Sequence, residues 1–350
     1  MNRVPSSLTG FDADWIGNCL AQLYPGTRLT GLRRGQVING TATKVEYFLE
    51  YNDVGQSFGL PSSLWLKCGV DAAMPEQVAH SAIEANFFRD IAPRLSINIP
   101  KPFGTVIEKD QSSGVVLYED LNQRPVEFGN QDSIISPQDM LATLDLLADF
   151  HASFWKADAL GDFDWLLPGG TIGNDGVIDQ FLGFWDYANA RPRFAEVPQE
   201  LRNLDRYSKA VHKLMRDDMA KPICLVHGDP HVGNQFRDAD GTPGLLDWAT
   251  VMQGHWAWDV SYAIISSQPV EQRRAHEREQ LGHYLSKLVE KGIAVPNMED
   301  AWRDYARHAA WNFMFALCPT ELQPEEMCVR NARRASAAMT DLDTLQLLLN

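Results

Sequence analysis

The sequence predicts a two-lobed α+β fold, in which a small antiparallel β-sheet with one helix precedes a larger, mainly helical region. Residues 28–70 have the pattern of strands, whereas the chain after Pro269 has the pattern of helices. A length of 350 residues suggests two domains or one large domain with two lobes. A hinge near 119–125 separates the two patterns. We therefore expect a first lobe over 1–122 and a second over 123–350.

The predicted first lobe begins with a short helix at residues 11–25. Three strands follow, at Arg28–Leu32, Lys44–Tyr51 and Ser63–Lys67. In the second strand, alternate apolar residues share one face, as in a half-buried strand. The segment 34–43 contains Asn39-Gly40, a strong hairpin signal, and we interpret it as the turn between the first two strands.

A helix over 76–95 comes next, with Pro93 near its end. Its apolar residues recur every four positions: Ala79, Ile83, Phe87, Ile91 and Leu95. This spacing places one stripe along a helix face. Strands at 103–108 and 114–119 complete the predicted sheet and lead into the hinge.

The predicted second lobe is mainly helical. After a loop at 123–136, Ser136 is a candidate N-cap and Pro137 occupies the first helical position. Residues 160–175 are expected to form a loop. The remaining predicted helices cover 177–189, 198–219, 270–292, 298–317 and 323–348.

Composition and charge limit the function. Hydrophobic residues make up 45% and charged residues 22%, which is ordinary for a globular protein. The net charge of −15 argues against nucleic-acid binding, because neutralising phosphates supplies most of such affinity. The same charge would suit a cationic substrate, although solubility alone explains it.

Cysteine usage and the N-terminal residues predict a cytoplasmic protein. The five cysteines are scattered and form no CxxC pair, which argues against a disulfide framework or a zinc site. Residues 1–26 lack the basic region and apolar run of a signal peptide. No stretch of 18 apolar residues predicts a membrane span, and nothing indicates an obligate protein partner.

The segment with the clearest chemistry is the predicted catalytic loop, residues 225–234, together with Asp247. An apolar run ends in His227-Gly228-Asp229, and Asn234 follows five residues after Asp229. A second apolar run ends at Asp247, 13 residues later. Oxygen-bearing side chains at strand ends suit Mg²⁺, which prefers hard oxygen ligands. Phosphoryl transfer also needs a carboxylate that orients the attacking hydroxyl.

Upstream residues suit a nucleotide. Lys67 ends a strand, and Glu84 lies 17 residues later on the predicted helix. Kinase-like folds use a strand lysine held by a helical glutamate to position nucleotide phosphates. Taken alone, both residues would be read as solvated side chains, but their place upstream of the catalytic loop favours the nucleotide site. Gly35, Gly40 and Thr41 belong to a turn that either covers the phosphates or forms an ordinary hairpin.

Together these motifs resemble the catalytic core of the aminoglycoside phosphotransferase and choline kinase superfamily, small-molecule relatives of protein kinases. His227-Gly228-Asp229, Asn234 and Asp247-Trp248 carry the resemblance, which spans about residues 28–320. The segments 151–155 (His-Ala-Ser-Phe-Trp) and 118–121 (Tyr-Glu-Asp-Leu) look more like the ecdysteroid-kinase-like branch of bacterial phosphotransferases. The resemblance implies a bilobal protein-kinase-like fold.

The resemblance also implies roles. Asp229 would be the catalytic base for the acceptor hydroxyl, and Asn234 and Asp247 would bind Mg²⁺. Lys67 would contact the phosphates of ATP, with Glu84 as its partner. The other implied residues are Glu119 and Leu121 at an adenine-binding hinge, and His227 and Asp259 as structural support of the catalytic loop.

Two departures from protein kinases bear on these roles. Trp248-Ala249 follows Asp247 where protein kinases have Phe-Gly, which favours the small-molecule branch. The segment 34–43 also lacks a full GxGxxG, so the resemblance does not assign single residues there to phosphates.

Three other functions are considered. A non-catalytic, pseudokinase-like protein would not need Lys67, Asp229, Asn234 and Asp247 together. An antibiotic-modifying enzyme would use the same chemistry on another acceptor. A metal hydrolase built on His227, His231 and Asp229 would lack a third histidine and leave Lys67 unused.

The predicted acceptor is a hydroxylated small molecule. Eight tryptophans lie in the second half of the chain, and most are expected in the core: Trp155, Trp165, Trp185, Trp248, Trp256, Trp258, Trp302 and Trp311. A few of them would suit an apolar acceptor pocket or an aromatic cage for a quaternary ammonium group. Both an apolar and a cationic acceptor stay open.

Overall fold

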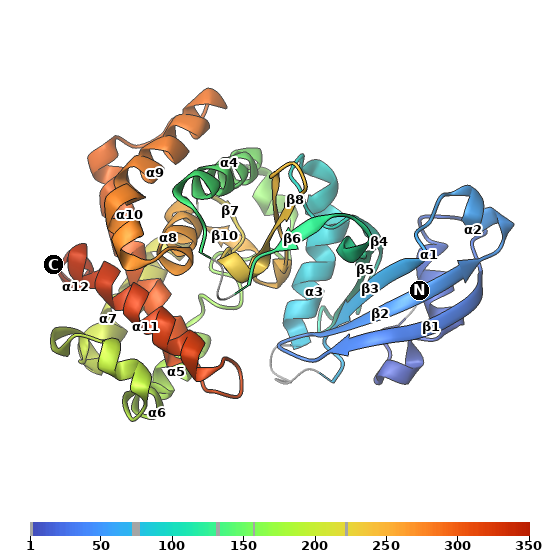
Figure 1. The fold of residues 1–350 in the computed structure, drawn as a ribbon, viewed down its shortest axis with the longest axis horizontal. Helices are drawn as coiled ribbons and strands as arrows, with labels where there is room; N and C mark the ends of the chain where they lie inside the picture. Colours follow the sequence, from blue (N-terminus) through green and yellow to red (C-terminus); the bar gives the residue numbers. More distant parts are fainter. Residues whose placement is uncertain (1–2, 72–77, 131–133, 157, 221–222) are drawn as a thin grey trace. The chain divides into compact units, whose positions relative to one another are not determined.

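The computed structural model describes residues 3–71, 78–130, 134–156, 158–220 and 223–350 (Figure 1). Its contacts divide the chain into two compact units. Unit 1 comprises Met1–Val126 and Leu246–Ala249, and unit 2 comprises Glu127–Leu245 and Thr250–Asn350. The sequence analysis placed the change of lobe after residue 122 and assigned Asp247 to the second lobe. The structure instead divides after Val126 and groups Asp247 with unit 1.

Unit 1 contains a five-stranded sheet in the order β1-β2-β3-β5-β4, with every neighbouring pair antiparallel. The strands are β1 Leu29–Ile38, β2 Thr43–Tyr51, β3 Ser63–Cys68, β4 Pro102–Ile107 and β5 Gly114–Glu119. The five predicted strands are confirmed. β1 is longer than the prediction, because a register shift between Arg34 and Val37 lets the strand continue past Gly35. The predicted turn at 34–43 therefore shortens to residues 39–42.

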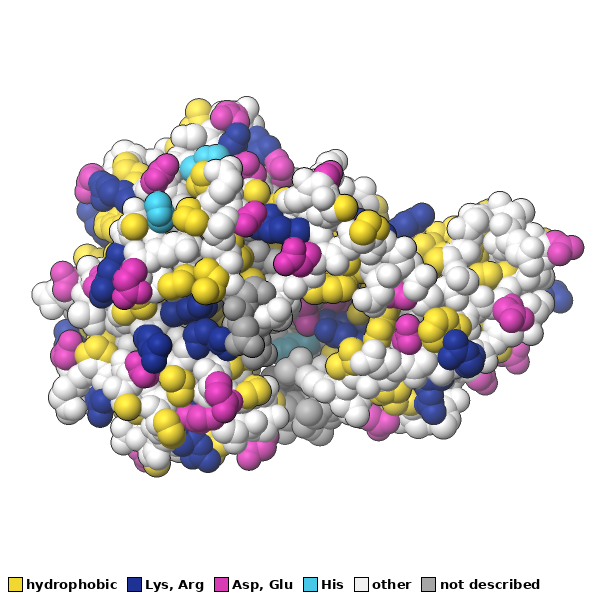
Figure 2. Space-filling model, in the orientation of Figure 1, with side chains coloured by type: hydrophobic (Ala, Val, Ile, Leu, Met, Phe, Trp, Pro, Cys, Tyr) yellow, Lys and Arg dark blue, Asp and Glu magenta, His cyan; other side chains and the backbone are white. Residues whose placement is uncertain are grey.

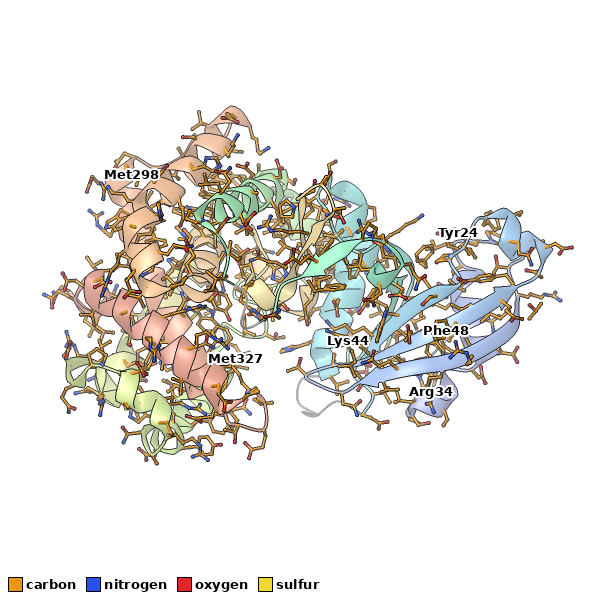
Figure 3. All side chains as sticks on the ribbon, in the orientation of Figure 1. Tyr24, Arg34, Lys44, Phe48, Met298 and Met327 are labelled. Atoms are coloured by element: carbon orange, nitrogen blue, oxygen red, sulfur yellow. The ribbon has the colours of Figure 1, made fainter. Side chains whose placement is uncertain are left out.

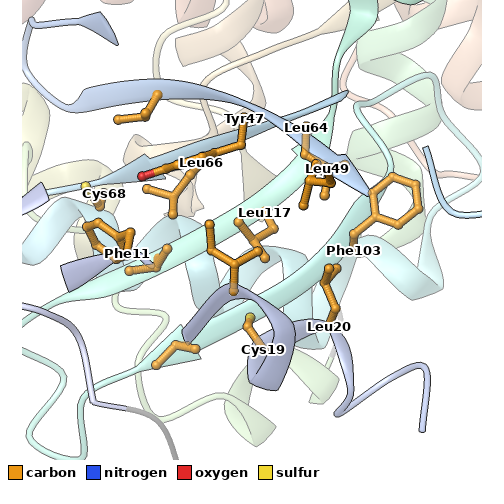
Figure 4. Close-up of a cluster of buried hydrophobic side chains, with 14 of the residues drawn as sticks. Phe11, Cys19, Leu20, Tyr47, Leu49, Leu64, Leu66, Cys68, Phe103 and Leu117 are labelled. Atoms are coloured by element: carbon orange, nitrogen blue, oxygen red, sulfur yellow. The ribbon is translucent and has the colours of Figure 1, made fainter. Parts of the chain in front are cut away.

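The two faces of this sheet have different characters. On one face, the strands pack with α1 (Ala13–Leu20) to form a buried hydrophobic core, part of which Figure 4 shows. Val45, Tyr47 and Leu49 of β2 belong to this core, as their alternation predicts. The residues between them, Lys44, Glu46 and Phe48, are only partly buried and belong to the opposite face. The polar chemistry of unit 1 therefore lies on one face of its sheet.

The predicted helix over 76–95 has a more complex form. α3 covers Val78–Asn86, a π-helical turn covers Phe87–Ile91, and residues 72–77 lie outside the described chain. Ala79 is exposed and Ile83 half-buried, so the first half of the predicted apolar stripe is wrong. The buried face instead includes Glu84, whose carboxylate has an ion partner in the sheet. The wider π turn then brings Phe87 and Ile91 into the interior.

Unit 2 is mainly helical and holds two small sheets. β6 (Val126–Phe128, which begins at the last residue of the first stretch of unit 1), β8 (Gln235–Asp238) and β9 (Pro243–Leu245) form one sheet. β7 (Cys224–Val226) and β10 (Met252–Gly254) form the other. The principal helices are α4 Pro137–Ser153, α5 Asp175–Gly183, α6 Trp185–Asn189, α7 Leu204–Ala220, α8 Trp256–Ser267, α9 Val270–Glu290, α10 Met298–Met314, α11 Glu325–Asp341 and α12 Thr344–Leu349.

Several predictions for unit 2 are confirmed and others need correction. α4 begins as predicted, because the Ser136 side chain accepts a hydrogen bond from the Asp139 N–H and Pro137 follows the cap. The predicted helix 177–189 is two helices that meet at Phe184. The predicted helix 323–348 breaks at Asp343, whose φ of 50° is left-handed. β6 lies within the segment expected to be a loop.

The charged side chains of the surface and the state of the cysteines are those that the composition predicts. Acidic and basic side chains are interspersed on the face that Figure 2 shows. All five cysteines are free and buried. Within the described ranges, no helix has the length and apolar character that crossing a membrane requires.

Candidate active site

Lys67 is the centre of the candidate site in unit 1. Leu66 and Cys68 of β3 enter the hydrophobic core, so the alternation of the strand directs Lys67 to the opposite face. Its side chain is only 3% exposed. The Lys67 Nζ atom lies 2.8 Å from Glu84 Oε2 and 2.7 Å from Asp247 Oδ1. One buried ammonium group thus joins the sheet, α3 and the segment 246–249.

The two carboxylates of this trio keep Lys67 in its charged form. Burial alone would lower the pKa of Lys67, but the carboxylates of Asp247 and Glu84 outweigh it and raise the pKa above its ordinary value. Lys67 is therefore a fixed positive charge at neutral pH. Removing one member of a buried ion pair is costly, because the remaining charge stays buried without compensation.

Trp248 anchors the segment that carries Asp247. Asp247 has a φ of 62°, a conformation uncommon outside glycine. The Trp248 N–H donates to Glu84 Oε1 at 3.3 Å, and its indole stacks on Phe87 with ring centres 4.1 Å apart. From the sequence, Trp248 was part of the Asp247-Trp248 motif, a departure from Phe-Gly and a candidate core residue, and it had no predicted anchoring role. The structure shows that this residue fastens Asp247 to α3 beside Lys67.

The hinge is organised by the side chain of Asp120, a residue that the sequence places within the predicted hinge 119–121 through backbone groups alone. Its buried carboxylate accepts hydrogen bonds from Ser63 Oγ at 2.7 Å, Trp65 Nε1 at 3.0 Å, Asn122 N at 3.1 Å, Asn122 Nδ2 at 2.9 Å and Gln123 Nε2 at 3.0 Å. Burial raises the pKa of this carboxyl, but the side chains that donate to it lower the pKa below its ordinary value. A carboxylate directly after a strand, with Asn122-Gln123 two and three residues later, is the sequence signal that could have found it.

The predicted hinge residues flank Asp120. Glu119 is half-buried at the end of β5, and its backbone N–H donates to the Lys101 carbonyl at 2.9 Å. Leu121 is buried and begins a short 3₁₀ turn. The structure thus brings Glu119 and Leu121 together with Asp120, and adenine contact at this hinge stays a prediction.

The predicted phosphate turn is only partly a turn. Gly35 lies inside β1, where an added Cβ would come within 2.2 Å of Glu46 Oε2 and 2.8 Å of the Phe48 ring. An added side chain at Gly35 would therefore crowd the side chains of β2, which is a strand contact rather than a feature of a turn. Gly40 and Thr41 lie in the loop between β1 and β2, which ends directly before Thr43, the first residue of β2. The structure places these two, but not Gly35, in the β1–β2 loop.

The catalytic loop of unit 2 follows β7. Gly228 has a φ of 87°, and an added Cβ would come within 2.6 Å of the Thr250 carbonyl oxygen. Asp259, in the first turn of α8, accepts the His227 N–H at 2.6 Å and the Gly228 N–H at 2.9 Å. The two oxygens of one buried carboxylate therefore fix two consecutive peptide groups.

Further contacts hold this arrangement in place. His151 Nε2 of α4 lies 3.1 Å from Asp259 Oδ2, and His151 Nδ1 lies 2.7 Å from the Tyr284 hydroxyl of α9. Trp258 Nε1 donates to the Gly228 carbonyl at 3.0 Å. Three helices thus support the loop.

Asp229 and Asn234 meet at the end of this loop. The Asp229 N–H donates to His227 Nδ1 at 3.2 Å. Asn234 Nδ2 donates to the Asp229 carbonyl at 2.9 Å and to Asp229 Oδ2 at 3.0 Å. The Asp229 side chain is 26% exposed, so water or a substrate can reach it. Tyr262 of α8 also bonds to this carboxylate, and burial, with the charge of Asp229, raises the pKa of the Tyr262 hydroxyl.

The oxygen-bearing side chains of Asp247 and Asn234 fit a hard cation better than a zinc-like metal. Across the described ranges, no group of three or more His, Cys, Asp and Glu side chains could hold a metal ion. This finding gives no support to the hydrolase site built on His227, His231 and Asp229. Mg²⁺ usually takes one or two protein ligands and completes its shell with phosphates and water. The Asp247 carboxylate suits it, as does Asn234, whose amide nitrogen is occupied by Asp229 and whose other atom is an oxygen.

The structure therefore groups the predicted residues in two sets. Lys67, Glu84 and Asp247 come together in unit 1. Asp229 and Asn234 come together in unit 2, with His227 and Asp259 beneath them. Sequence reasoning missed the hydrogen bonds of the Asp120 side chain, the anchoring role of Trp248, and Tyr262.

Comparisons with known proteins give a consistent result. A family model described as "Phosphotransferase enzyme family" (APH) matches residues 72–311. No curated protein matches the chain. Among solved structures, an ethanolamine kinase from Plasmodium vivax has a TM-score of 0.53 at 11% identity, covering 90% of this chain and 83% of that one. This likeness supports the protein-kinase-like α+β fold.

Two further solved structures are similar over nearly the whole chain. Choline kinase LicA from Streptococcus pneumoniae is 13% identical, covers 93% of this chain and 98% of its own, and has a TM-score of 0.48. Macrolide 2′-phosphotransferase MphH from Brachybacterium faecium is 18% identical, with coverage of 93% and 97% and a TM-score of 0.48.

Proposed function

This chain belongs to the phosphotransferase enzyme family, and we propose that it transfers the γ-phosphoryl group of ATP to a hydroxyl group of a small acceptor molecule. The observation that carries this proposal is the buried Lys67, paired with both Glu84 and Asp247. A lysine fixed by two carboxylates is a preorganised positive charge for nucleotide phosphates. A protein that served only as a scaffold would not need it.

Asp229 is the base in this proposal. The oxygen Oδ2 is fixed by Asn234, and the loop behind it is fixed by Asp259. A carboxylate held in this way can orient the acceptor hydroxyl and accept its proton as the O–P bond forms. Positioning and charge neutralisation supply most of the rate enhancement in phosphoryl transfer, because the protein makes no covalent bond to the phosphoryl group.

Mg²⁺ would be held by Asp247 and the amide oxygen of Asn234. The ion would neutralise charge on the phosphate oxygens during transfer. Glu119 and Leu121 would line the adenine site at the hinge, with Asp120 fixing the backbone between them. The loop with Gly40 and Thr41 would offer backbone N–H groups to the phosphates.

The acceptor is a hydroxylated small molecule of apolar or cationic character. The net charge of −15 favours a cation and disfavours nucleic acid as a partner. The free, buried cysteines suit a reducing cytoplasm, where ATP is also available.

The Asp229→Asn variant tests the reaction. Turnover should be lost, while ATP binding should be nearly unchanged, because the substitution keeps the shape of the side chain and removes only the base. The measurement is a phosphate-transfer screen over hydroxylated steroids, lipids, aminoglycosides, macrolides and choline analogues, with ATP affinity determined by calorimetry. Undiminished phosphoryl transfer by Asp229→Asn would refute the assignment.

The alternative is a non-catalytic nucleotide-binding protein. Mg²⁺-dependent ATP hydrolysis without an acceptor separates the two, because an enzyme that positions the γ-phosphate also allows slow attack by water. Wild-type hydrolysis that disappears in Asp229→Asn supports the enzyme, whereas equal rates in both proteins favour the non-catalytic function.

A further inference from the structure

Lys44, the second residue of β2, is the direct cross-strand neighbour of Lys67. Such neighbours lie on the same face of a sheet, with Cβ atoms about 5 Å apart. Thr43 and Val45 on either side of Lys44 are fully buried, whereas Lys44 is partly buried. Lys44 therefore belongs to the face that carries Lys67, and Figure 3 marks it at the start of β2.

The charges around Lys44 are not balanced by a partner of its own. Glu84 and Asp247 are the carboxylates that act on it, and both bind Lys67 directly. Within the described chain, Lys44 makes no hydrogen bond and no ion pair through its side chain. Burial, followed by the charge of Lys67, lowers the pKa of the Lys44 ammonium group. Two like charges on directly opposed residues destabilise a sheet.

Such a cost is relieved when an anion binds between the two ammonium groups. The loop with Gly40 and Thr41, proposed above to meet phosphates, ends directly before β2. An ammonium group is a point charge that suits phosphate oxygens. We propose that Lys44 is a second phosphate-binding lysine, which together with Lys67 holds the polyphosphate chain of the nucleotide. This inference rests on the proposed function and adds a residue to its binding site.

The melting temperature of the ligand-free protein distinguishes phosphate binding by Lys44 from a purely structural role. If the side chain of Lys44 served only to stabilise the sheet, removing its charge would lower the melting temperature. If Lys44 instead binds an anion, the ligand-free Lys44→Gln variant should melt at the same temperature as the wild type or higher, because the repulsion between Lys44 and Lys67 is removed. Nucleotide binding stabilises a protein in proportion to affinity, so the ligand-induced increase in melting temperature should shrink in this variant.

The test measures ADP and adenosine binding by calorimetry in the wild type, Lys44→Gln, Lys44→Arg and Lys109→Gln. Lys109 is an exposed lysine of the same unit, in the turn between β4 and β5, and controls for loss of one charge. Loss of one charged hydrogen bond should weaken ADP binding about 10- to 100-fold in Lys44→Gln. Adenosine affinity should not change, Lys44→Arg should retain most of the ADP affinity, and Lys109→Gln should match the wild type.

Three results would overturn the inference. Equal ADP affinity in the wild type and Lys44→Gln would exclude the contact while leaving the proposed function intact. An equal loss of adenosine and ADP affinity, or a lower melting temperature without ligand, would indicate a structural role. A wild-type protein that binds neither ADP nor ATP would refute the proposed function and this inference together.

Discussion

Asp120 shows how one side chain can determine the local geometry of a binding site. Its carboxylate is buried, yet hydrogen bonds from β3 and from the hinge satisfy it. Because donors on two segments converge on one group, the hinge backbone is fixed relative to the sheet in the ligand-free protein. Preorganisation of this kind lowers the entropic cost of binding.

We expect the Asp120→Asn variant to lose about 2 kcal/mol of unfolding free energy at pH 7, because an amide N–H would face groups that themselves donate. The folded-state pKa of Asp120 is lowered, so its contribution is present above the unfolded pKa of about 3.9 and is lost as the pH falls through the folded value. The difference in unfolding free energy between the variant and the wild type should therefore become smaller as the pH falls.

Urea unfolding at pH 7 and at pH 2.5, below the unfolded pKa of about 3.9, measures this difference. Asp14→Asn, at an exposed position of α1 in the same unit, is the matched control and should unfold nearly like the wild type. A difference that grows on acidification would contradict the assigned role of the carboxylate.

The sequence predicted individual residues well where chemistry restricts the choice of amino acid. Lys67, Glu84 and Asp247 were identified as candidates before their contacts were known, and the structure places them within hydrogen-bonding distance. Lys44 and Trp248 were not, because their significance lies in contacts with residues distant in the chain. The significance of Lys44 depends on strand register, and that of Trp248 depends on stacking with Phe87, 161 positions away. Neither contact produces a local pattern in the sequence.

At the scale of elements, α8 is the helix that sequence periodicity missed. All of its residues except Ser266 are buried. A helix that is buried all round has no polar face, so the period of 3.6 residues disappears from its sequence. The same burial explains its function, because α8 carries Asp259, Trp258 and Tyr262 to the catalytic loop.

The breaks within helices have another cause. The apolar pattern continues through Phe184 and through Asp343, and only the backbone conformation interrupts the helices there. Hydrophobic periodicity reports which side of an element is buried, but it does not report a local change of dihedral angle. Helix existence was therefore predicted better than helix continuity.

Alanine substitutions at two glycines should change the unfolding free energy in opposite directions. Gly282 lies inside α9 and an added Cβ would meet nothing within 4 Å, so Gly282→Ala should raise the unfolding free energy by about 0.5–1 kcal/mol. Gly228→Ala should lower it by at least about 1 kcal/mol, because its φ is positive and its Cβ would strike the Thr250 carbonyl.

Guanidinium unfolding of both variants gives the two values. Gly228→Ala should also reduce phosphoryl transfer, since the peptide held by Asp259 would shift, while Gly282→Ala should leave transfer unchanged. A Gly228→Ala protein as stable and active as the wild type would show that the loop does not need the left-handed conformation.

At the scale of the whole molecule, the residues of the proposed site belong to two units. Unit 1 holds Lys67 with Glu84 and Asp247, and unit 2 holds Asp229 with Asn234. Each set is supported by contacts within its own unit.

Stability of the whole chain should depend on pH through a buried histidine pair in unit 2. His255 stacks on His308 with ring centres 5.0 Å apart, and His308 Nε2 lies 2.7 Å from Asp218 Oδ2. Burial, together with His308, lowers the pKa of His255 to about 3. Burial opposes protonation of His308, but Asp218 outweighs it and raises the pKa of His308.

The two histidines therefore act in opposite directions. A raised folded-state pKa stabilises the protein below the unfolded value near 6.5, and this contribution is lost as the pH rises. A lowered one acts in reverse: between about pH 6.5 and 3 the unfolded chain binds a proton at His255 that the folded chain does not. His255 thus costs up to about 1.4 kcal/mol for each pH unit in that window.

The His255→Asn variant isolates this cost. His255 caps α8 by accepting the Ala257 N–H, and asparagine also caps helices, so the variant retains the helix start without the titration. Between pH 6.5 and 5 its unfolding free energy should fall less than that of the wild type, by about 1–2 kcal/mol. Parallel stability curves for the two proteins over this range would show that His255 protonates equally in the folded and unfolded states.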